Sequence, residues 1–98
     1  MKAAVYYRNS DVRIEERPLP AIGPGEALVK VMAAGICGTD VLEWYRVKAA
    51  PVVLGHENAG VVEESKAADW KKGDRVIVSH HVPCNACKAC TSGHHAAC

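Results

Sequence analysis

The sequence predicts a mainly β domain that ends in a metal-binding lobe. Short runs rich in Val, Ile, Ala and Tyr are separated by Gly- and Pro-containing turns, which is the pattern of antiparallel strands. Four of the five cysteines lie in one short segment, residues 84–98. The chain has 98 residues, so we expect one domain, residues 1–98, in which residues 83–98 form the lobe.

Composition limits both the core and the partners of this chain. Phe is absent and there are two Trp and three Tyr, so we expect a thin core filled by Val, Ile, Leu and Ala. The formal net charge is +1, and Lys and Arg form no basic run, which argues against a nucleic-acid partner. The apolar stretches are far shorter than the roughly 20 residues of a membrane helix. No secretory signal opens the chain, so we expect no membrane partner and a cytoplasmic location.

The first two strands are expected at residues 2–7 and 12–16. The first is a β-type run of Ala, Val and Tyr. The second alternates apolar Val12 and Ile14 with polar neighbours, which is typical of a half-buried strand. Two prolines follow at once and end it, because proline has no amide hydrogen to donate to a neighbouring strand.

A third strand is expected at residues 26–33, after a Gly-Pro-Gly turn at residues 23–25. In this strand Val29 and Val31 would share one face, and Lys30 would lie on the other. The first three strands together are expected to form an antiparallel sheet.

The cysteine spacing at the end of the chain favours a zinc site. Two residues separate each of the first three cysteines and seven precede the last, with a turn at Ser92-Gly93. Zinc closes a tetrahedron of four such thiolates. A bacterial iron–sulfur run also begins with this spacing but continues differently, and a disulfide pair would need an oxidising compartment. The four cysteines are Cys84, Cys87, Cys90 and Cys98.

The fifth cysteine, Cys37, lies between two glycines after the third strand. A lone cysteine is most often a small buried hydrophobe. A second glycine-flanked segment contains His56 and Glu57, ahead of a strand expected at residues 59–64. Thiolate, imidazole and carboxylate are the mixed ligands of a catalytic zinc, which keeps one position open. The nineteen positions between Cys37 and His56 imply no contact by themselves.

Four motifs in one order carry a family resemblance. They are G-I-C-G-T-D at 35–40, G-H-E-N-A-G at 55–60, G-D-R-V at 73–76 and the four-cysteine lobe. The whole chain resembles the N-terminal, GroES-like catalytic domain of zinc-dependent medium-chain alcohol and polyol dehydrogenases. That resemblance implies a partial β-barrel with short helices.

The resemblance also implies roles for single residues. Cys37 and His56 would be ligands of a catalytic zinc, and Glu57 would modulate or transiently replace its water ligand. Thr39 would be the hydroxyl that relays the substrate proton. The four lobe cysteines would hold a structural zinc.

By this resemblance the reaction converts an alcohol or polyol to an aldehyde or ketone with NAD or NADP. The resemblance implies that the dinucleotide-binding Rossmann domain and the third protein ligand of the catalytic zinc lie outside these residues. The absence of a G-x-G-x-x-G motif agrees with this for the Rossmann domain. We therefore expect the isolated chain to be inactive and a full-length protein to be a homodimer or homotetramer. The alternative is a stand-alone zinc-stabilised binding module without dehydrogenase activity.

The chain departs from the family pattern near the proposed relay. Many relatives place a histidine shortly after the threonine, whereas this chain has Val41, Leu42 and Glu43. The connections 39–54 and 60–73 also look short, which would trim one wall of the substrate cleft.

Several residues near the motifs have more than one interpretation. Trp44 and Tyr45 could line the substrate pocket or pack in the core. Asp40 could orient a metal-binding side chain or cap a short helix. Four histidines are expected to be solvated, because four sulfurs already complete a tetrahedron: His80, His81, His94 and His95.

Overall fold

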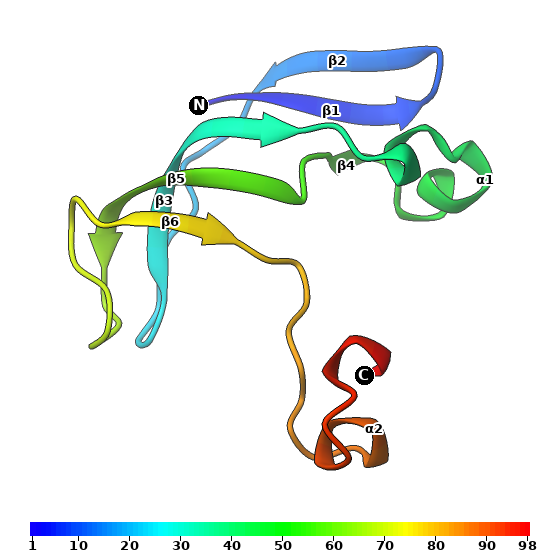
Figure 1. Cartoon of the computed structure of the whole chain (residues 1–98). Coiled ribbons are helices and arrows are strands. Elements are labelled where there is room, and N and C mark those ends of the chain that lie inside the picture. Colours follow the sequence, from blue (N-terminus) through cyan, green and yellow to red (C-terminus); the bar gives the residue numbers. More distant parts are fainter.

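The computed structural model describes all 98 residues and contains two three-stranded antiparallel sheets (Figure 1). The strand orders are β2-β1-β4 and β3-β5-β6. In chain order the elements are β1 (Lys2–Arg8), β2 (Asp11–Glu16), β3 (Ala27–Gly35), η1 (Gly38–Val41), α1 (Glu43–Arg46), η2 (Val47–Ala49), β4 (Val52–Val53), β5 (Glu57–Ser65), β6 (Arg75–Val78), α2 (Lys88–Thr91) and η3 (His95–Ala97). The prediction of a mainly β chain with short helices is confirmed.

The first sheet is built on the β1–β2 hairpin. Val5 and Tyr6 of β1 are fully buried. The prediction that β2 is half buried on its apolar face is wrong, because Val12 and Ile14 are 53% and 71% exposed. β2 is an edge strand whose extensive contacts are with β1 alone, and its other face is held by polar bonds such as Tyr7 OH to Glu15 Oε1 at 2.7 Å.

The second sheet begins with β3, which corrects the prediction that the first three strands form one sheet. β3 pairs with β5 rather than with β1 or β2. The reason lies in the connection between β2 and β3. It contains three of the five prolines, which have no amide hydrogen, so it cannot fold back as a tight paired hairpin.

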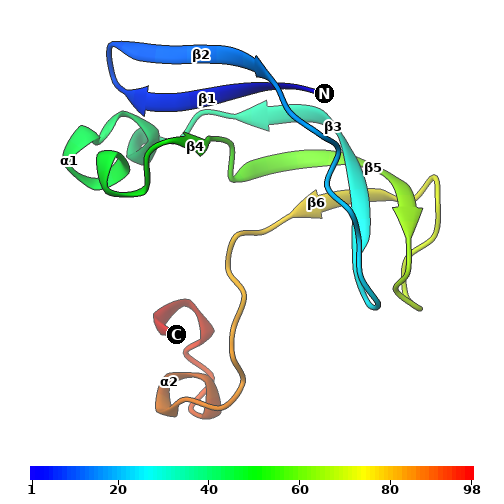
Figure 2. The same ribbon diagram turned by 180° about the vertical axis from the view of Figure 1, so that it is seen from behind.

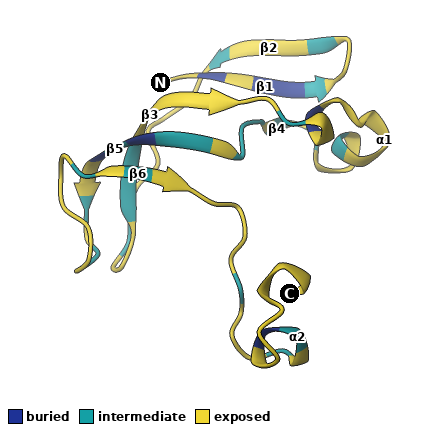
Figure 3. Ribbon diagram, viewed as in Figure 1, coloured by how far each residue is buried: buried dark blue, intermediate teal, exposed yellow.

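The expectation of a thin core is confirmed, since only seven residues are buried. The expected composition of that core is only partly right. Val5, Val62 and Ala3 belong to it, but Tyr6 is its largest member and neither Ile nor Leu contributes. Figure 3 shows that most of the ribbon is exposed or intermediate.

The cysteine lobe lies apart from the two sheets. After β6 the chain runs through an extended segment to α2 and η3, and both views place these short helices below the sheets (Figures 1 and 2). Cys90 is the buried residue of the lobe. No helix of the structure has the length and apolar character needed to cross a membrane.

The lack of space at Gly60, between β3 and β5, predicts a stability effect. A Cβ on buried Gly60 would overlap the backbone carbonyl oxygen of Lys30 and lie 2.7 Å from Val29 Cγ1. We expect Gly60→Ala to lower the free energy of unfolding by about 1–3 kcal/mol, the usual cost of overpacking. Urea unfolding followed by circular dichroism measures this.

Gly23→Ala is the matched control. A Cβ there would make only an ordinary contact, 3.5 Å from Glu26 Oε2. Its unfolding midpoint should therefore equal or slightly exceed that of the wild type. Equal midpoints for the two variants would contradict the close packing of β3 against β5.

Candidate metal centres

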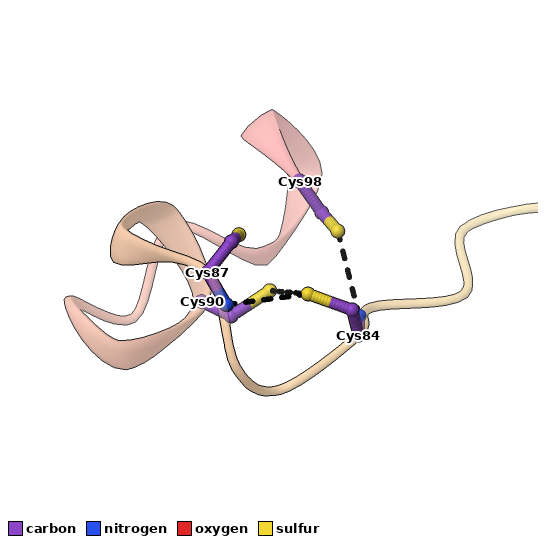
Figure 4. Close-up of side chains that lie close together, drawn as sticks. All are labelled: Cys84, Cys87, Cys90 and Cys98. Carbon is purple, nitrogen blue, oxygen red and sulfur yellow. Dashed lines mark hydrogen bonds between the residues drawn. The ribbon is translucent and has the colours of Figure 1, made fainter.

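The four lobe thiols converge on one point. Their sulfur atoms all lie within 4.8 Å of one another, and Cys84 and Cys90 are 4.0 Å apart (Figure 4). Two residues with positive φ turn the chain back, Asn85 at 56° and Gly93 at 82°. Cys90 lies in α2 and Cys87 caps its start. All five cysteines of the chain are free thiols, so the structure contains no disulfide.

The backbone of the lobe favours thiolate at Cys84. Amide groups of Ala86 and Cys87 donate to this sulfur, the Cys87 bond being 3.3 Å long, and they lower the pKa of Cys84 to about 6. Burial acts in the opposite direction and raises the pKa of the Cys90 thiol. Thiolate is the form that binds metal, so these amides prepare one ligand before any metal arrives.

A second group of possible ligands is formed by Cys37, His56 and Glu57. One donor atom of each lies within 4.8 Å of the others. Cys37 follows β3, whereas His56 and Glu57 stand at the start of β5. The register of these antiparallel strands pairs Gly35 with Glu57, and this pairing brings the two distant segments together.

Glycines make room for this second group. A Cβ on Gly35 would lie only 2.5 Å from Glu57 Oε2, so the carboxylate occupies space that any other residue would fill. Gly55 adopts φ of 110°, which L side chains rarely take, and so allows the turn that presents His56.

Asp40 connects the Cys37 turn to His56. Only 7% of it is exposed, and its Oδ2 accepts a 2.9 Å hydrogen bond from the backbone amide of Cys37. Its Oδ1 lies 2.7 Å from Arg46 Nη2 and 3.5 Å from His56 Nδ1. A helix starting after Thr39 with Asp40 as its cap is not observed: η1 begins at Gly38 with Cys37 as its N-cap, and Asp40 is its third residue, whose side chain accepts from the N-cap amide. The same carboxylate faces the ring of a possible ligand, His56. Nε2 of His56 is left as the nitrogen free to face a metal.

The sequence analysis did not predict a role for Arg46, the last residue of α1, whose side chain lies against this centre. Its Nη2 donates to Thr39 Oγ1 at 3.0 Å, so the proposed relay hydroxyl is bonded to a guanidinium. No motif could have revealed this contact, because a single arginine after two aromatic residues has no signature of its own. Neither η1 nor α1 contains the histidine that many relatives place shortly after the threonine, as the sequence indicated.

A cavity of about 400 Å³ opens beside His56 and Glu57, and His80 lines it. The ring of His80 stands edge-on to that of His56, with centroids 4.8 Å apart. The four histidines predicted to be solvated are exposed, but the contact of His80 with His56 was not foreseen. Trp44 and Tyr45 are also exposed, so their alternative role in the core is excluded, and neither lines this cavity.

Comparison with known proteins identifies similar chains. Residues 23–98 match the family described as alcohol dehydrogenase GroES-like domain. Sorbitol dehydrogenase of Bacillus subtilis is 42% identical over 107 positions, covering 100% of this chain and 30% of the relative. Sorbitol dehydrogenase of Gallus gallus is 39% identical, covering 93% and 28%. A probable D-xylulose reductase A of Aspergillus fumigatus is 38% identical, covering 89% and 27%.

Solved structures agree with the sequence comparison. Alcohol dehydrogenase TADH from Thermus sp. ATN1 superposes with a TM-score of 0.79 at 34% identity, covering 100% of this chain and 30% of that chain. A cobalt- and zinc-bound thermostable alcohol dehydrogenase from Pyrobaculum aerophilum gives 0.82 at 31% identity, covering 100% and 32%. The chain thus spans about 30% of the length of these relatives.

The geometry around Asp40 predicts a stability effect. Asp40→Ala removes the partner of the half-buried Arg46 guanidinium, so we expect a loss of about 3 kcal/mol in unfolding free energy. Asp11→Ala is the matched control, since it breaks an ion pair of the same 2.7 Å length with an exposed arginine. Solvent screening should make its effect clearly smaller. Equal urea midpoints for the two variants would show that Asp40 does not hold the centre together.

Proposed function

Because the chain belongs to the alcohol dehydrogenase GroES-like domain family, we propose that it forms the zinc-binding catalytic part of an alcohol or polyol dehydrogenase that uses NAD or NADP. The observation that carries this proposal is the convergence of Cys37, His56 and Glu57 within 4.8 Å. The relatives named sorbitol dehydrogenase and D-xylulose reductase support a small polyol, or the matching carbonyl compound, as substrate.

The donor atoms of this second group suit a zinc ion. Sulfur, imidazole nitrogen and carboxylate oxygen are the ligands that zinc takes, at about 2.0–2.3 Å. On a tetrahedral ion such donors are about 3.3–3.8 Å apart by simple geometry from those bond lengths. Atoms already within 4.8 Å need only small side-chain rotations to reach that spacing. Cys37 and His56 are proposed as firm ligands, and Glu57 as the neighbour that modulates or replaces the water ligand.

The lobe is proposed as a structural zinc site held by its four thiolates. Four sulfurs complete the tetrahedron and leave no position for substrate. The exposure of the lobe and its separation from the sheets fit a role in folding or assembly rather than in chemistry.

The chemistry then divides between the bound groups and this chain. A zinc ion held by Cys37 and His56 would supply Lewis acidity for an alcohol oxygen, and a bound nicotinamide would supply the hydride acceptor. Thr39 Oγ1 accepts the proton of the substrate hydroxyl and releases its own hydrogen toward solvent or the cofactor. Asp40 keeps the His56 ring oriented through Nδ1. The cavity beside His56 and Glu57 is the proposed entry for the substrate.

The proposal includes the surroundings of the enzyme. We propose a cytoplasmic protein, a location that agrees with five free thiols. Its partners would be small alcohols, polyols or carbonyl compounds. We propose a homodimer or homotetramer for the protein that carries the cofactor domain.

Metal analysis tests the lobe. Chain purified without added metal should contain zinc, and Cys90→Ser should lose it, because serine is a poor zinc ligand. The variant should keep its sheet circular dichroism and become sensitive to protease between Val82 and Cys98, since the lobe lies outside the sheets. Cys37→Ser is the control and should keep the lobe zinc. A zinc-free wild type with an intact, protease-resistant lobe would overturn this part of the proposal.

Turnover tests the second centre. The chain alone should not reduce NAD or NADP with D-sorbitol, because hydride transfer needs the reacting carbons held about 3–3.5 Å apart and no dinucleotide site is proposed here. Substituted for the matching segment of Bacillus subtilis sorbitol dehydrogenase, it should support turnover. Cys37→Ser and His56→Ala should abolish this activity with lobe zinc retained. Thr39→Val should lower kcat sharply with both metals bound.

The outcomes separate the alternatives. A folded chimera that contains zinc at both centres yet oxidises no polyol would favour the stand-alone zinc-stabilised binding module. Full activity of the Thr39→Val variant would show that a group other than Thr39 relays the substrate proton.

A further inference from the structure

Arg46 is the one residue of α1 (Glu43–Arg46) that is turned inward. Its neighbours on this helix are exposed, whereas 19% of the Arg46 side chain is accessible. Its guanidinium reaches both Thr39 and Asp40. Nε donates to the backbone oxygen of Thr39 at 3.0 Å, and Nη2 donates to Thr39 Oγ1 at 3.0 Å and to Asp40 Oδ1 at 2.7 Å. Nη2 also lies 3.3 Å from His56 Nδ1.

Contacts at the start of α1 and in η1 hold the backbone that carries Arg46. Glu43 Oε1 accepts a 3.0 Å hydrogen bond from the backbone amide of Asn9. The side-chain amide of Asn9 donates to the backbone oxygen of Val41 at 2.9 Å, and its carbonyl accepts from the hydroxyl of buried Tyr6. The short helix is thus fixed to the β1–β2 turn and to the core. This anchor fixes the backbone that carries Arg46, and the guanidinium also lies over the ring of Tyr45, 5.4 Å from its centroid.

A guanidinium can hold the relay hydroxyl but cannot extend the relay. It has five N–H donors and no acceptor, and it does not lose its proton in proteins. Thr39 Oγ1 has two lone pairs and one hydrogen. The bond from Arg46 occupies one lone pair, so the other lone pair and the hydrogen are left for substrate and solvent. A proton that reaches Thr39 therefore cannot continue into the protein through Arg46.

The hydrogens of Nη2 connect this hydroxyl to the metal centre. Nη2 has two hydrogens and faces three acceptors: Thr39 Oγ1, Asp40 Oδ1 and His56 Nδ1. If Nε2 of His56 binds a metal, Nδ1 carries the ring hydrogen and stops accepting. Two acceptors then remain for two hydrogens, so occupation of the metal site favours a full hydrogen bond to Thr39.

We propose that Arg46 is a positioning residue, which orients the Thr39 hydroxyl toward substrate and directs the proton from Thr39 to solvent or the cofactor rather than into the protein, in a chain that lacks the relay histidine of many relatives. This inference rests on the dehydrogenase function proposed above. The simpler role, a counter-ion for Asp40, would explain the 2.7 Å ion pair but needs neither bond to Thr39.

Double-mutant cycles separate the two roles. Arg46→Lys keeps the charge beside Asp40, but one ammonium cannot make both bonds to Thr39. Thr39→Val deletes the acceptor Oγ1. If Arg46 bonds to Thr39, the two substitutions remove one shared interaction, and the loss in urea midpoint of the double variant should be smaller than the sum of the single losses. This cycle uses the 98-residue chain itself and needs no activity.

The same cycle is then measured on turnover in the Bacillus subtilis chimera. Arg46→Lys should lower kcat by about tenfold to hundredfold through misplacement of the hydroxyl, with the KM for D-sorbitol nearly unchanged. In the Thr39→Val background the same substitution should change kcat by less than about twofold. Cobalt loading followed by thiolate absorbance confirms that both metal centres stay filled.

Arg13→Lys is the matched control. Arg13 makes a two-bond ion pair with Asp11 and has no contact with the centre, so its substitution should leave kcat unchanged. Additive losses in both cycles, or full kcat in Arg46→Lys, would reduce Arg46 to a counter-ion and overturn the inference. An inactive wild-type chimera would instead count against the proposed dehydrogenase function, and the stability cycle would still decide whether Arg46 holds Thr39.

Discussion

The pairing of β3 with β5 is the constraint on which the second centre depends. Gly35 stands opposite Glu57 in this register, and Gly60 lies against the backbone of Lys30 with no room for a Cβ. A shift of one residue would turn every side chain of a strand to the opposite face. Cys37 and His56 would then no longer point to a common site. Gly60 therefore acts by allowing two backbones to approach, whereas Gly35 leaves space for the Glu57 side chain. The ligand geometry depends on both.

Charge is the second requirement of this centre, and Asp40 balances it. A carboxylate with 7% exposure is tolerated because it accepts hydrogen bonds from the Cys37 amide and from Arg46. The pair keeps the local charge near neutral while Cys37 and Glu57 remain free to supply negative charge to a cation. The same carboxylate faces His56 Nδ1, so one buried group connects the turn that presents the thiol to the ring that would bind beside it.

Sequence reasoning predicted those features that depend on local pattern. Short strands, the turn before Ala27 and the clustering of the lobe cysteines all follow from residues near one another in the chain. The exposure of Ile14 could not be predicted, because alternation identifies a face but not whether another element covers it. The contacts of Arg46 could not be predicted for a related reason. Its partners become neighbours only when α1 is fixed against the β1–β2 turn, through contacts that no spacing encodes.

The two centres therefore differ in how folding assembles them. The lobe thiols lie within fifteen residues, so the entropy cost of closing their loops is small, and amide bonds already favour thiolate at Cys84. Its metal can gather the ligands almost independently of the sheets. The second centre joins residues nineteen positions apart through the pairing of two nine-residue strands, and it exists only when that sheet is formed. Because few side chains are buried, the hydrophobic effect contributes little to the stability of this sheet. The hydrogen bonds and ion pair of Asp40, Arg46 and Asn9 consequently have two roles. They stabilise the fold, and they orient the side chains of the second centre.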